Sequence, residues 1–224
     1  SARTACADDA SGLQIRQGEL RRGSMAPLGI RGKVRAMRIL LPALLALFAA
    51  TSASAADSYR FDTVHSQVQF RVSHLGFSES EGEFHDLRGG FRFDRDDWSK
   101  SSCDVTIGIA SLDLDDEAWN RKLLESDWFD GARHPDMRFR CLQVTQKDEH
   151  HGRIDGELTL RGITRPVSLD LQFNRAAIHK YSLKYTAGFS ATTMIRRSDY
   201  GMHKYIPEIG DEIAIRLDIE GQRE

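Results

Sequence analysis

Apolar and polar residues alternate with a period of two through most of the chain after residue 57. Val68, Phe70 and Val72 alternate with polar neighbours, and the same pattern recurs over Val167–Phe173. Because successive side chains of a strand point to opposite faces, this pattern predicts half-buried strands. About eight or nine such strands follow from the alternation.

The connections between these strands determine the type of sheet. Turn signals such as His150-His151-Gly152 and Arg161-Gly162 separate the strands, and no helix-length periodic run lies between successive ones. Parallel strands need long crossover connections, so the sheet is predicted to be antiparallel. A sheet with one apolar face per strand and no covering helices closes on itself or forms a sandwich. One long strand is expected to carry five residues of a single parity, which are Leu183, Tyr185, Ala187, Phe189 and Ala191.

One segment, Asp113–His134, departs from the strand pattern. Asp115 or Asp116 can cap a short helix, and Trp128 follows in a second turn. We predict a short helical insert and prefer a plug over one end of the barrel. An ordinary surface excursion with its own small core is the alternative.

Residues 37–56, MRILLPALLALFAATSASAA, have the pattern of a signal peptide. Arg38 precedes an apolar run over 39–50, and Ala53-Ser54-Ala55 matches the A-x-A cleavage pattern. A transmembrane helix is the alternative, but the run has about 12 residues where ~20 are needed to span a bilayer. We therefore expect no permanent membrane anchor.

The chain then divides into three parts. Residues 1–36 are expected to be an upstream extension, disordered or not translated, because a signal peptide normally starts at its own methionine, here Met37. Residues 57–224 form the predicted barrel domain. Residues 1–56 hold eight of the 31 basic and three of the 33 acidic residues, which leaves the mature chain with a net charge of about −7. This balance argues against a nucleic-acid partner, since phosphates favour basic surfaces.

Two cysteines remain after processing, Cys103 and Cys141. In an oxidising compartment such a pair can form a disulfide, and two buried free thiols are the alternative. No C-x-x-C spacing indicates a metal site.

The histidines suggest an enzyme only weakly. No H-x-H or HExxH spacing falls on one predicted element, and no G-x-S-x-G motif is present. His65 and His74 are expected to form hydrogen bonds within the barrel. A histidine-dependent metallohydrolase is the least favoured function, and we expect no catalytic residues, metal or cofactor.

Four stretches resemble one known family. They are FDTVHSQVQFRVSHLGFS (Phe61–Ser78), LLESDWFDGARHPDMRF (Leu123–Phe139), GELTLRGITRPVSL (Gly156–Leu169) and IRRSDYG (Ile195–Gly201). In order and spacing they resemble the YceI-like, polyisoprenoid-binding proteins across 59–220. The resemblance implies an extended, lipocalin-like antiparallel barrel in the bacterial periplasm. It also implies a carrier of isoprenoid chains, isoprenoid quinones or similar lipids, with proposed roles in lipid handling or stress response.

An eight-stranded barrel is just wide enough to fill with side chains or to hold one ligand. Small residues of inward parity, Ala187, Ala191 and Gly156, are expected to leave an apolar channel, unless neighbouring aromatic rings fill these gaps. Ten buried methylenes would contribute roughly 8 kcal/mol before ordering costs. The predicted lumen residues are Phe70, Val72, Phe84, Phe91, Ile107, Ile109, Trp128, Phe139, Leu158, Leu160, Leu169, Ala187, Phe189, Ala191 and Ile215.

A lipid head group requires polar partners at one end of the barrel. The candidates are Arg196, Arg197 and His203, which lie in a basic segment near a strand end. The alternative, which we favour, is that Arg197 pairs with Asp199 to fix the loop while the other residues are solvated. A barrel that serves as a structural or interaction protein is the main alternative to a lipid carrier, and the family resemblance allows a homodimer.

Overall fold

The computed structural model describes residues 55–224 of the protein. The extension predicted for 1–36 and nearly all of the signal peptide predicted for 37–56 lie outside these residues. In the described part, every helix is too short or too polar to cross a membrane.

Most described residues lie in β-strands. The strands are β1 (Asp57–Phe61), β2 (Gln67–His74), β3 (Ser78–Phe84), β4 (Leu87–Phe93), β5 (Ser102–Gly108), β6 (Leu112–Asp113), β7 (Asp136–Gln146), β8 (His151–Leu160), β9 (Ile163–Ile178), β10 (Tyr185–Arg196) and β11 (Ile209–Arg223). The helices are α2 (Glu117–Leu123) and the 3-10 turns η2 (Trp98–Lys100), η3 (Ile109–Ser111) and η4 (Arg197–Tyr200).

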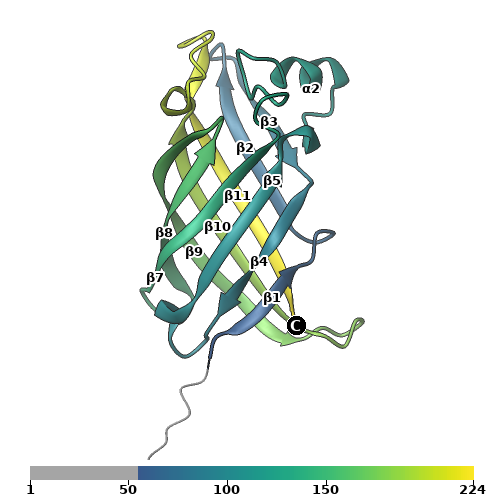
Figure 1. The fold of residues 1–224 in the computed structure, drawn as a ribbon, viewed down its shortest axis with the longest axis vertical. Helices are drawn as coiled ribbons and strands as arrows, with labels where there is room; N and C mark the ends of the chain where they lie inside the picture. Colours follow the sequence, from purple (N-terminus) through teal and green to yellow (C-terminus); the bar gives the residue numbers. More distant parts are fainter. Residues whose placement is uncertain (1–54) are drawn as a thin grey trace, which may run out of the picture. The chain divides into compact units, whose positions relative to one another are not determined.

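Eight of the strands close into a barrel. Their order is β1-β4-β5-β7-β8-β9-β10-β11, and β1 pairs with the end of β11 to complete the ring. All pairings are antiparallel, and closure of the ring through β1 removes open sheet edges around most of the wall. Strands β2, β3 and β6 extend the sheet from the first half of β11. Figure 1 shows the strands crossing the barrel obliquely, with α2 at the upper end and the C-terminus at the lower end. The predicted lipocalin-like, antiparallel barrel of about eight strands is confirmed.

The wall is interrupted between β9 and β10. Their ladder ends at Asp170 and Thr192, and beyond this point each strand pairs only with its other neighbour. The turn η4 contacts β9, β10 and β11 there, and it buries Tyr200 to 1% exposure. Across the gap the Thr193 hydroxyl donates a hydrogen bond to the Ser168 carbonyl oxygen (2.7 Å). The gap is therefore closed by side chains rather than by a strand ladder.

The helical insert begins as the sequence predicts. Asp116 caps α2, and its carboxylate accepts a hydrogen bond from the backbone N–H of Trp119 (2.8 Å). Leu124 ends the helix, and the following residues form turns that carry Trp128 and Phe129. The Phe129 ring packs edge-on against Phe84 of β3 (5.6 Å between centroids). The insert is thus attached to the barrel by its aromatic side chains.

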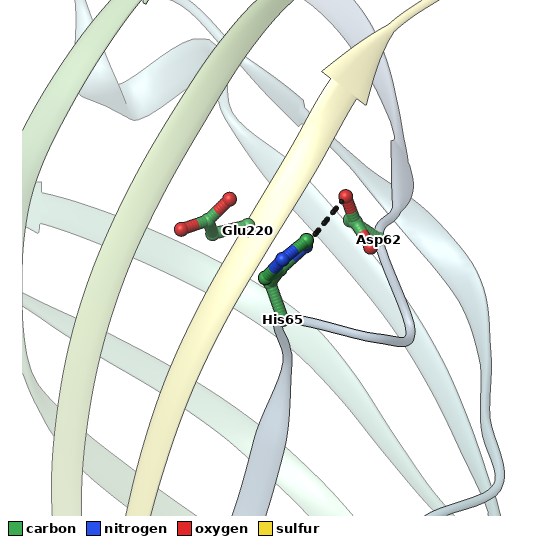
Figure 2. Close-up of side chains that lie close together, drawn as sticks. All are labelled: Asp62, His65 and Glu220. Atoms are coloured by element: carbon green, nitrogen blue, oxygen red, sulfur yellow. Dashed lines mark ion pairs between the residues drawn. The ribbon is translucent and has the colours of Figure 1, made fainter. Parts of the chain in front are cut away.

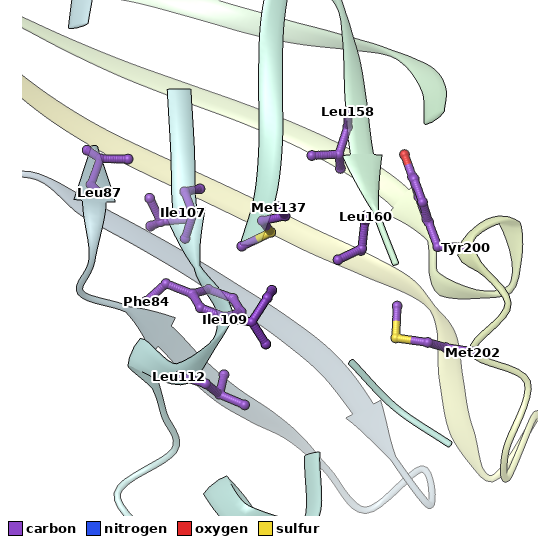
Figure 3. Packing of buried hydrophobic residues seen from close by; sticks show 11 residues of the cluster. Phe84, Leu87, Ile107, Ile109, Leu112, Met137, Leu158, Leu160, Tyr200 and Met202 are labelled. Atoms are coloured by element: carbon purple, nitrogen blue, oxygen red, sulfur yellow. The ribbon is translucent and has the colours of Figure 1, made fainter. Parts of the chain in front are cut away.

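Buried apolar residues form two clusters along the barrel. The upper cluster includes Phe84, Ile107 and Leu160, and Figure 3 shows its members converging from several strands. The lower cluster is centred on Phe93, and it includes Trp98. The space between the strands is therefore filled at two levels by different side chains.

The structure joins Cys103 of β5 and Cys141 of β7 in a disulfide with a Cα–Cα distance of 5.0 Å. The two residues lie next to the cross-strand pair Asp104–Arg140, so the β5–β7 register brings them opposite each other. Of the two states left open by the sequence, the structure has the disulfide rather than free thiols.

Replacing both cysteines, Cys103→Ala with Cys141→Ala, is expected to lower the free energy of unfolding. The bond closes a segment with a sequence separation of 38, and a crosslink of this kind contributes about 2–4 kcal/mol by restricting the unfolded chain. Urea unfolding with and without reductant measures the effect. The reductant should destabilise only the wild type, and an equal response of both proteins would contradict the prediction.

Candidate functional site

A cavity of about 420 Å³ lies inside the barrel, and nearly all of its lining is apolar. Small-molecule sites in proteins occupy roughly 300–1,000 Å³ and are lined mainly by apolar and aromatic side chains. The size and lining of this cavity are therefore those of a ligand site for an apolar molecule.

The structure places most of the predicted lumen residues in the cavity wall. These are Phe70, Val72, Phe84, Phe91, Ile107, Trp128, Phe139, Leu158, Leu160, Leu169, Phe189, Ala191 and Ile215. Two predicted residues do not line it, Ile109 and Ala187. Strand β5 ends at Gly108, so Ile109 falls in η3 and is fully buried in the upper cluster. Ala187 keeps the inward parity but is fully buried in the lower cluster.

Glycines in the wall accommodate aromatic rings rather than leaving empty space. A Cβ atom added to Gly156 would collide with the ring of Phe139, and one added to Gly82 would collide with the ring of Phe70. The prediction that Gly156 leaves a gap in the channel is therefore wrong, because the Phe139 ring occupies that gap. Both phenylalanines also line the cavity, so their rings lie between the wall and the central space.

Aromatic rings form the lower end of the cavity. Phe93 and Phe189 line it and contact each other edge-on, 4.9 Å between centroids. Trp98 and Phe173 pack against Phe93 from outside the lining, at 5.7 and 5.3 Å. Trp98 comes from η2, directly after β4. The strand alternation could not identify this residue as part of the floor, because it lies in a turn.

The insert forms part of the upper end, or mouth, of the cavity. Its lining residues are Leu114, Trp119, Lys122, Leu123, Trp128 and Phe129. The Trp128 ring lies between the guanidinium group of Arg197 (5.3 Å) and the ring of Tyr205 (6.3 Å). An ion pair between Lys204 and Asp127 links the insert to the loop before β11. The insert is therefore part of the cavity wall, as the plug prediction requires.

Arg197 is the one head-group candidate that lines the cavity. Its guanidinium donates four hydrogen bonds to backbone carbonyl oxygens, those of Gly210 (2.9 Å), Met202 (2.9 Å), Lys204 (2.8 Å) and Ile209 (2.9 Å). Burial lowers the pKa of Arg197 from its ordinary value. A guanidinium has five N–H groups, so one on Nη1 makes no hydrogen bond within residues 55–224.

The favoured alternative for this segment predicted that Arg197 fixes the loop, which is correct, and that it does so by pairing with Asp199, which is wrong. Arg197 does fix the loop, but through these carbonyl groups and not through Asp199. The nearby carboxylate is that of Asp211, which accepts hydrogen bonds from the backbone and hydroxyl of Ser198 (2.9 and 2.8 Å).

The other two head-group candidates lie away from the cavity. Arg196 is exposed on the outer face and pairs with Glu212 (3.7 Å), and His203 is exposed in the loop after η4. Two polar residues that the sequence did not single out for this role, His74 and Lys122, line the mouth instead. His74 was a predicted barrel residue, and its ring faces Trp119 at 5.8 Å. Lys122 had no sequence signal, since it resembles any exposed helix lysine.

Asp62 and His65, on the turn between β1 and β2, lie close to Glu220 of β11, and all three are outside the cavity lining (Figure 2). Their ligand atoms lie within 4.8 Å of one another, so these side chains could approach a metal ion. Asp62 already accepts hydrogen bonds from Val64 N–H (3.2 Å) and from the side chain of Gln222 (2.9 Å), and it pairs with His65 (3.0 Å). The group is explained as a brace of the turn. The expectation that His65 bonds within the barrel is wrong, because its side chain is largely exposed.

The Asp62–His65 pair predicts a pH dependence of stability. The hydrogen bond that the His65 ring donates to the Asp62 carboxylate raises the pKa of His65 above its ordinary 6.5. Burial acts to raise the pKa of Asp62, but the interactions with His65, together with the hydrogen bonds from Val64 and Gln222, outweigh it and leave the value below 3.8. Stability from His65 is complete below pH 6.5 and is lost as pH rises through its raised pKa. Stability from Asp62 is complete above pH 3.8 and is lost as pH falls through its lowered pKa.

The variant His65→Gln should therefore be less stable than wild type mainly between pH 3.8 and pH 6.5. The difference in stability between the two proteins should shrink above neutral pH. Thermal unfolding across this pH range measures it, and His203→Gln serves as the control, because His203 is exposed and makes no ion pair within residues 55–224. A difference in stability between wild type and His65→Gln that does not change with pH would contradict a stabilising role of the Asp62–His65 pair.

Comparison with known proteins gives matches over most of the chain. The YceI-like domain family matches residues 59–221. A UPF0312 protein of Serratia proteamaculans is 32% identical over 179 residues, which cover 79% of this chain and 92% of the relative.

Solved structures share the barrel. The YCEI protein of Campylobacter jejuni has a TM-score of 0.61 and 28% identity, covering 68% of this chain and 90% of that protein. A polyisoprenoid binding domain from Saccharophagus degradans has a TM-score of 0.57 and 14% identity, covering 75% of this chain and 99% of that domain. At that identity the second likeness shows the fold alone.

Proposed function

This chain belongs to the YceI-like family, and from that premise we propose that it is a non-catalytic carrier whose cavity holds the tail of an isoprenoid lipid or similar long amphiphile. The observation that carries the proposal is the 420 Å³ cavity with its almost wholly apolar lining. Water gains few hydrogen bonds from such a wall, and a hydrocarbon tail replaces it favourably. The polyisoprenoid-binding domain that shares the fold supports an isoprenoid tail.

Selectivity in such a cavity comes from shape. The walls offer aliphatic and aromatic surface along the barrel, so affinity grows with the apolar area of the tail. The aromatic floor around Phe93 and Phe189 limits how far a tail extends. The carrier therefore selects by tail length and thickness more than by chemical detail.

The head group belongs at the mouth in this proposal. His74, Lys122 and the free N–H of Arg197 can donate hydrogen bonds to a quinone or phosphate oxygen. Lys122 already binds Glu125 (2.5 Å), so an anionic head group must compete with that carboxylate.

A periplasmic location is part of the proposal. The signal-peptide pattern of residues 37–56 supports export. The disulfide between Cys103 and Cys141 supports an oxidising compartment. Export by this route would bring the carrier to the lipids of the cell envelope.

The absence of catalysis is proposed on the arrangement of the site. Among residues 55–224, the grouped metal-ligating side chains are Asp62, His65 and Glu220, and they lie outside the cavity lining. The cavity wall itself offers few groups that can move a proton.

Solvent extraction of the purified protein followed by mass spectrometry tests the proposal. We expect a stoichiometric isoprenoid or related long-chain lipid. A protein that is reproducibly empty and also fails to take up isoprenoid quinone would favour a structural or interaction role. Bound zinc together with hydrolytic turnover would favour an enzyme.

The variant Ala191→Trp should lose at least tenfold in affinity for an isoprenoid quinone, because Ala191 lines the cavity and an indole would occupy it. Thr192→Trp is the matched control, since the next residue of β10 is exposed on the outer face. Ala187→Trp is unsuitable, because Ala187 is fully buried and the larger side chain would disrupt packing. Binding is measured by quenching of protein fluorescence relative to each variant's own baseline. If the folded Ala191→Trp and Thr192→Trp proteins bind the quinone with equal affinity, the ligand site lies elsewhere.

A further inference from the structure

The hairpin between β9 and β10 exposes three large apolar side chains. Ile178, Tyr181 and Leu183 are 66%, 82% and 76% exposed. Leu183 was predicted to face the barrel interior, but the chain leaves the ladder after Ile178 and Leu183 lies in the turn. Single exposed apolar residues are common, whereas three within six positions form a concentrated patch.

The same hairpin is locally basic. Arg175, Lys180 and Lys184 lie in it, and no acidic residue occurs between Asp170 and Asp199. This is unusual in a mature chain with a net charge of about −7. Local positive charge therefore coincides with the exposed apolar patch.

The turn is held in a defined conformation. The backbone N–H of His179 donates to the Lys184 carbonyl (2.8 Å), and that of Leu183 donates to the His179 carbonyl (2.9 Å). Lys184 Nζ also binds the side chain of Gln222 on β11 (2.8 Å), which ties the base of the hairpin to the barrel. The Lys180 ammonium lies 5.4 Å from the centroid of the Tyr181 ring. The charged and apolar groups are therefore held together in one conformation, so little conformational entropy is lost when the hairpin binds.

The hairpin extends from the lower end of the barrel, at the end that carries the C-terminus (Figure 1). The insert with α2 lies at the other end. Contact made through the hairpin would therefore leave the cavity mouth free.

We propose that residues 174–186 form a docking surface for an anionic lipid bilayer. Aromatic and aliphatic tips are suited to the head-group region of a bilayer, and neighbouring lysine and arginine side chains are attracted to anionic lipid phosphates. With three apolar tips and three basic residues, the contact is weak and reversible. It requires no permanent anchor, and it does not depend on what the cavity holds.

Charge distinguishes this hairpin from the exposed apolar residues at the mouth end. Phe77 and Trp119 are also exposed, but acidic residues surround them. These acidic residues are Glu79, Asp113, Asp115, Asp116, Glu117 and Glu208. The mouth end mixes these acidic residues with basic ones such as Arg121, Lys122 and Lys204, whereas the hairpin carries only basic residues, so an anionic surface favours the hairpin as the bilayer contact.

Co-sedimentation with vesicles tests the proposal, using phosphatidylcholine alone and an equal mixture with phosphatidylglycerol. We expect binding to the anionic vesicles only, and weaker binding at high salt. Lys180→Gln with Lys184→Gln should lower partitioning roughly 20- to 30-fold, at about fivefold per charge. Tyr181→Ser with Leu183→Ser should also lower it, whereas Phe77→Ser at the mouth end should not.

Circular dichroism establishes that each variant is folded. Ala191→Trp should still bind vesicles, which separates this contact from ligand uptake. Failure to bind anionic vesicles, or equal binding by the wild type and the lysine variants, would overturn the proposal. Self-association of the wild type that is lost in Tyr181→Ser with Leu183→Ser, without vesicle binding, would make the hairpin an interface between protein copies and also overturn it.

Discussion

The cavity depends on the positions of the inward-facing aromatic rings. An eight-stranded barrel has little spare interior, and large inward side chains normally fill it. Here the rings of Phe70 and Phe139 lie over Gly82 and Gly156, where any Cβ atom would collide with them. Because a glycine has no side chain, each ring fits close against the wall beside it, and the centre of the barrel stays open. The ligand cavity therefore results from placing each phenylalanine ring beside a glycine of the neighbouring strand.

The two ends of the barrel are closed by different physical means. At the lower end, Phe93 and Trp98 belong to a cluster of mutually packed aromatic rings. At the mouth, the buried charge of Arg197 is compensated by backbone carbonyl groups from the surrounding loop. That guanidinium also supports Trp128 of the insert. The floor is therefore mainly aromatic, while the mouth combines apolar surface with hydrogen-bond donors, as an amphiphile requires.

Charge and apolar exposure are distributed unevenly over the molecule. At the mouth end, the exposed Trp119 closely follows an acidic segment, while the hairpin that contains Tyr181 carries basic residues and no acidic ones. This asymmetry gives the barrel two chemically different ends. The ligand cavity and the proposed bilayer contact can therefore act independently, since no side chain takes part in both.

The amino-acid sequence by itself determined the antiparallel strands and a short helix capped by Asp115 or Asp116, because alternation and capping are local properties of the chain. The family resemblance added that the sheet closes into a barrel, and the structure selects Asp116 as the cap. It also identified most of the cavity wall, since side-chain parity follows directly from a strand. Parity failed at Ile109 and Leu183, where the chain leaves its strand, and at Ala187, where neighbours bury the inward face. Only the tertiary structure decided the aromatic floor, the partners of Arg197 and the rings over glycines. Each of these depends on contacts between residues far apart in the chain, and no local pattern records them.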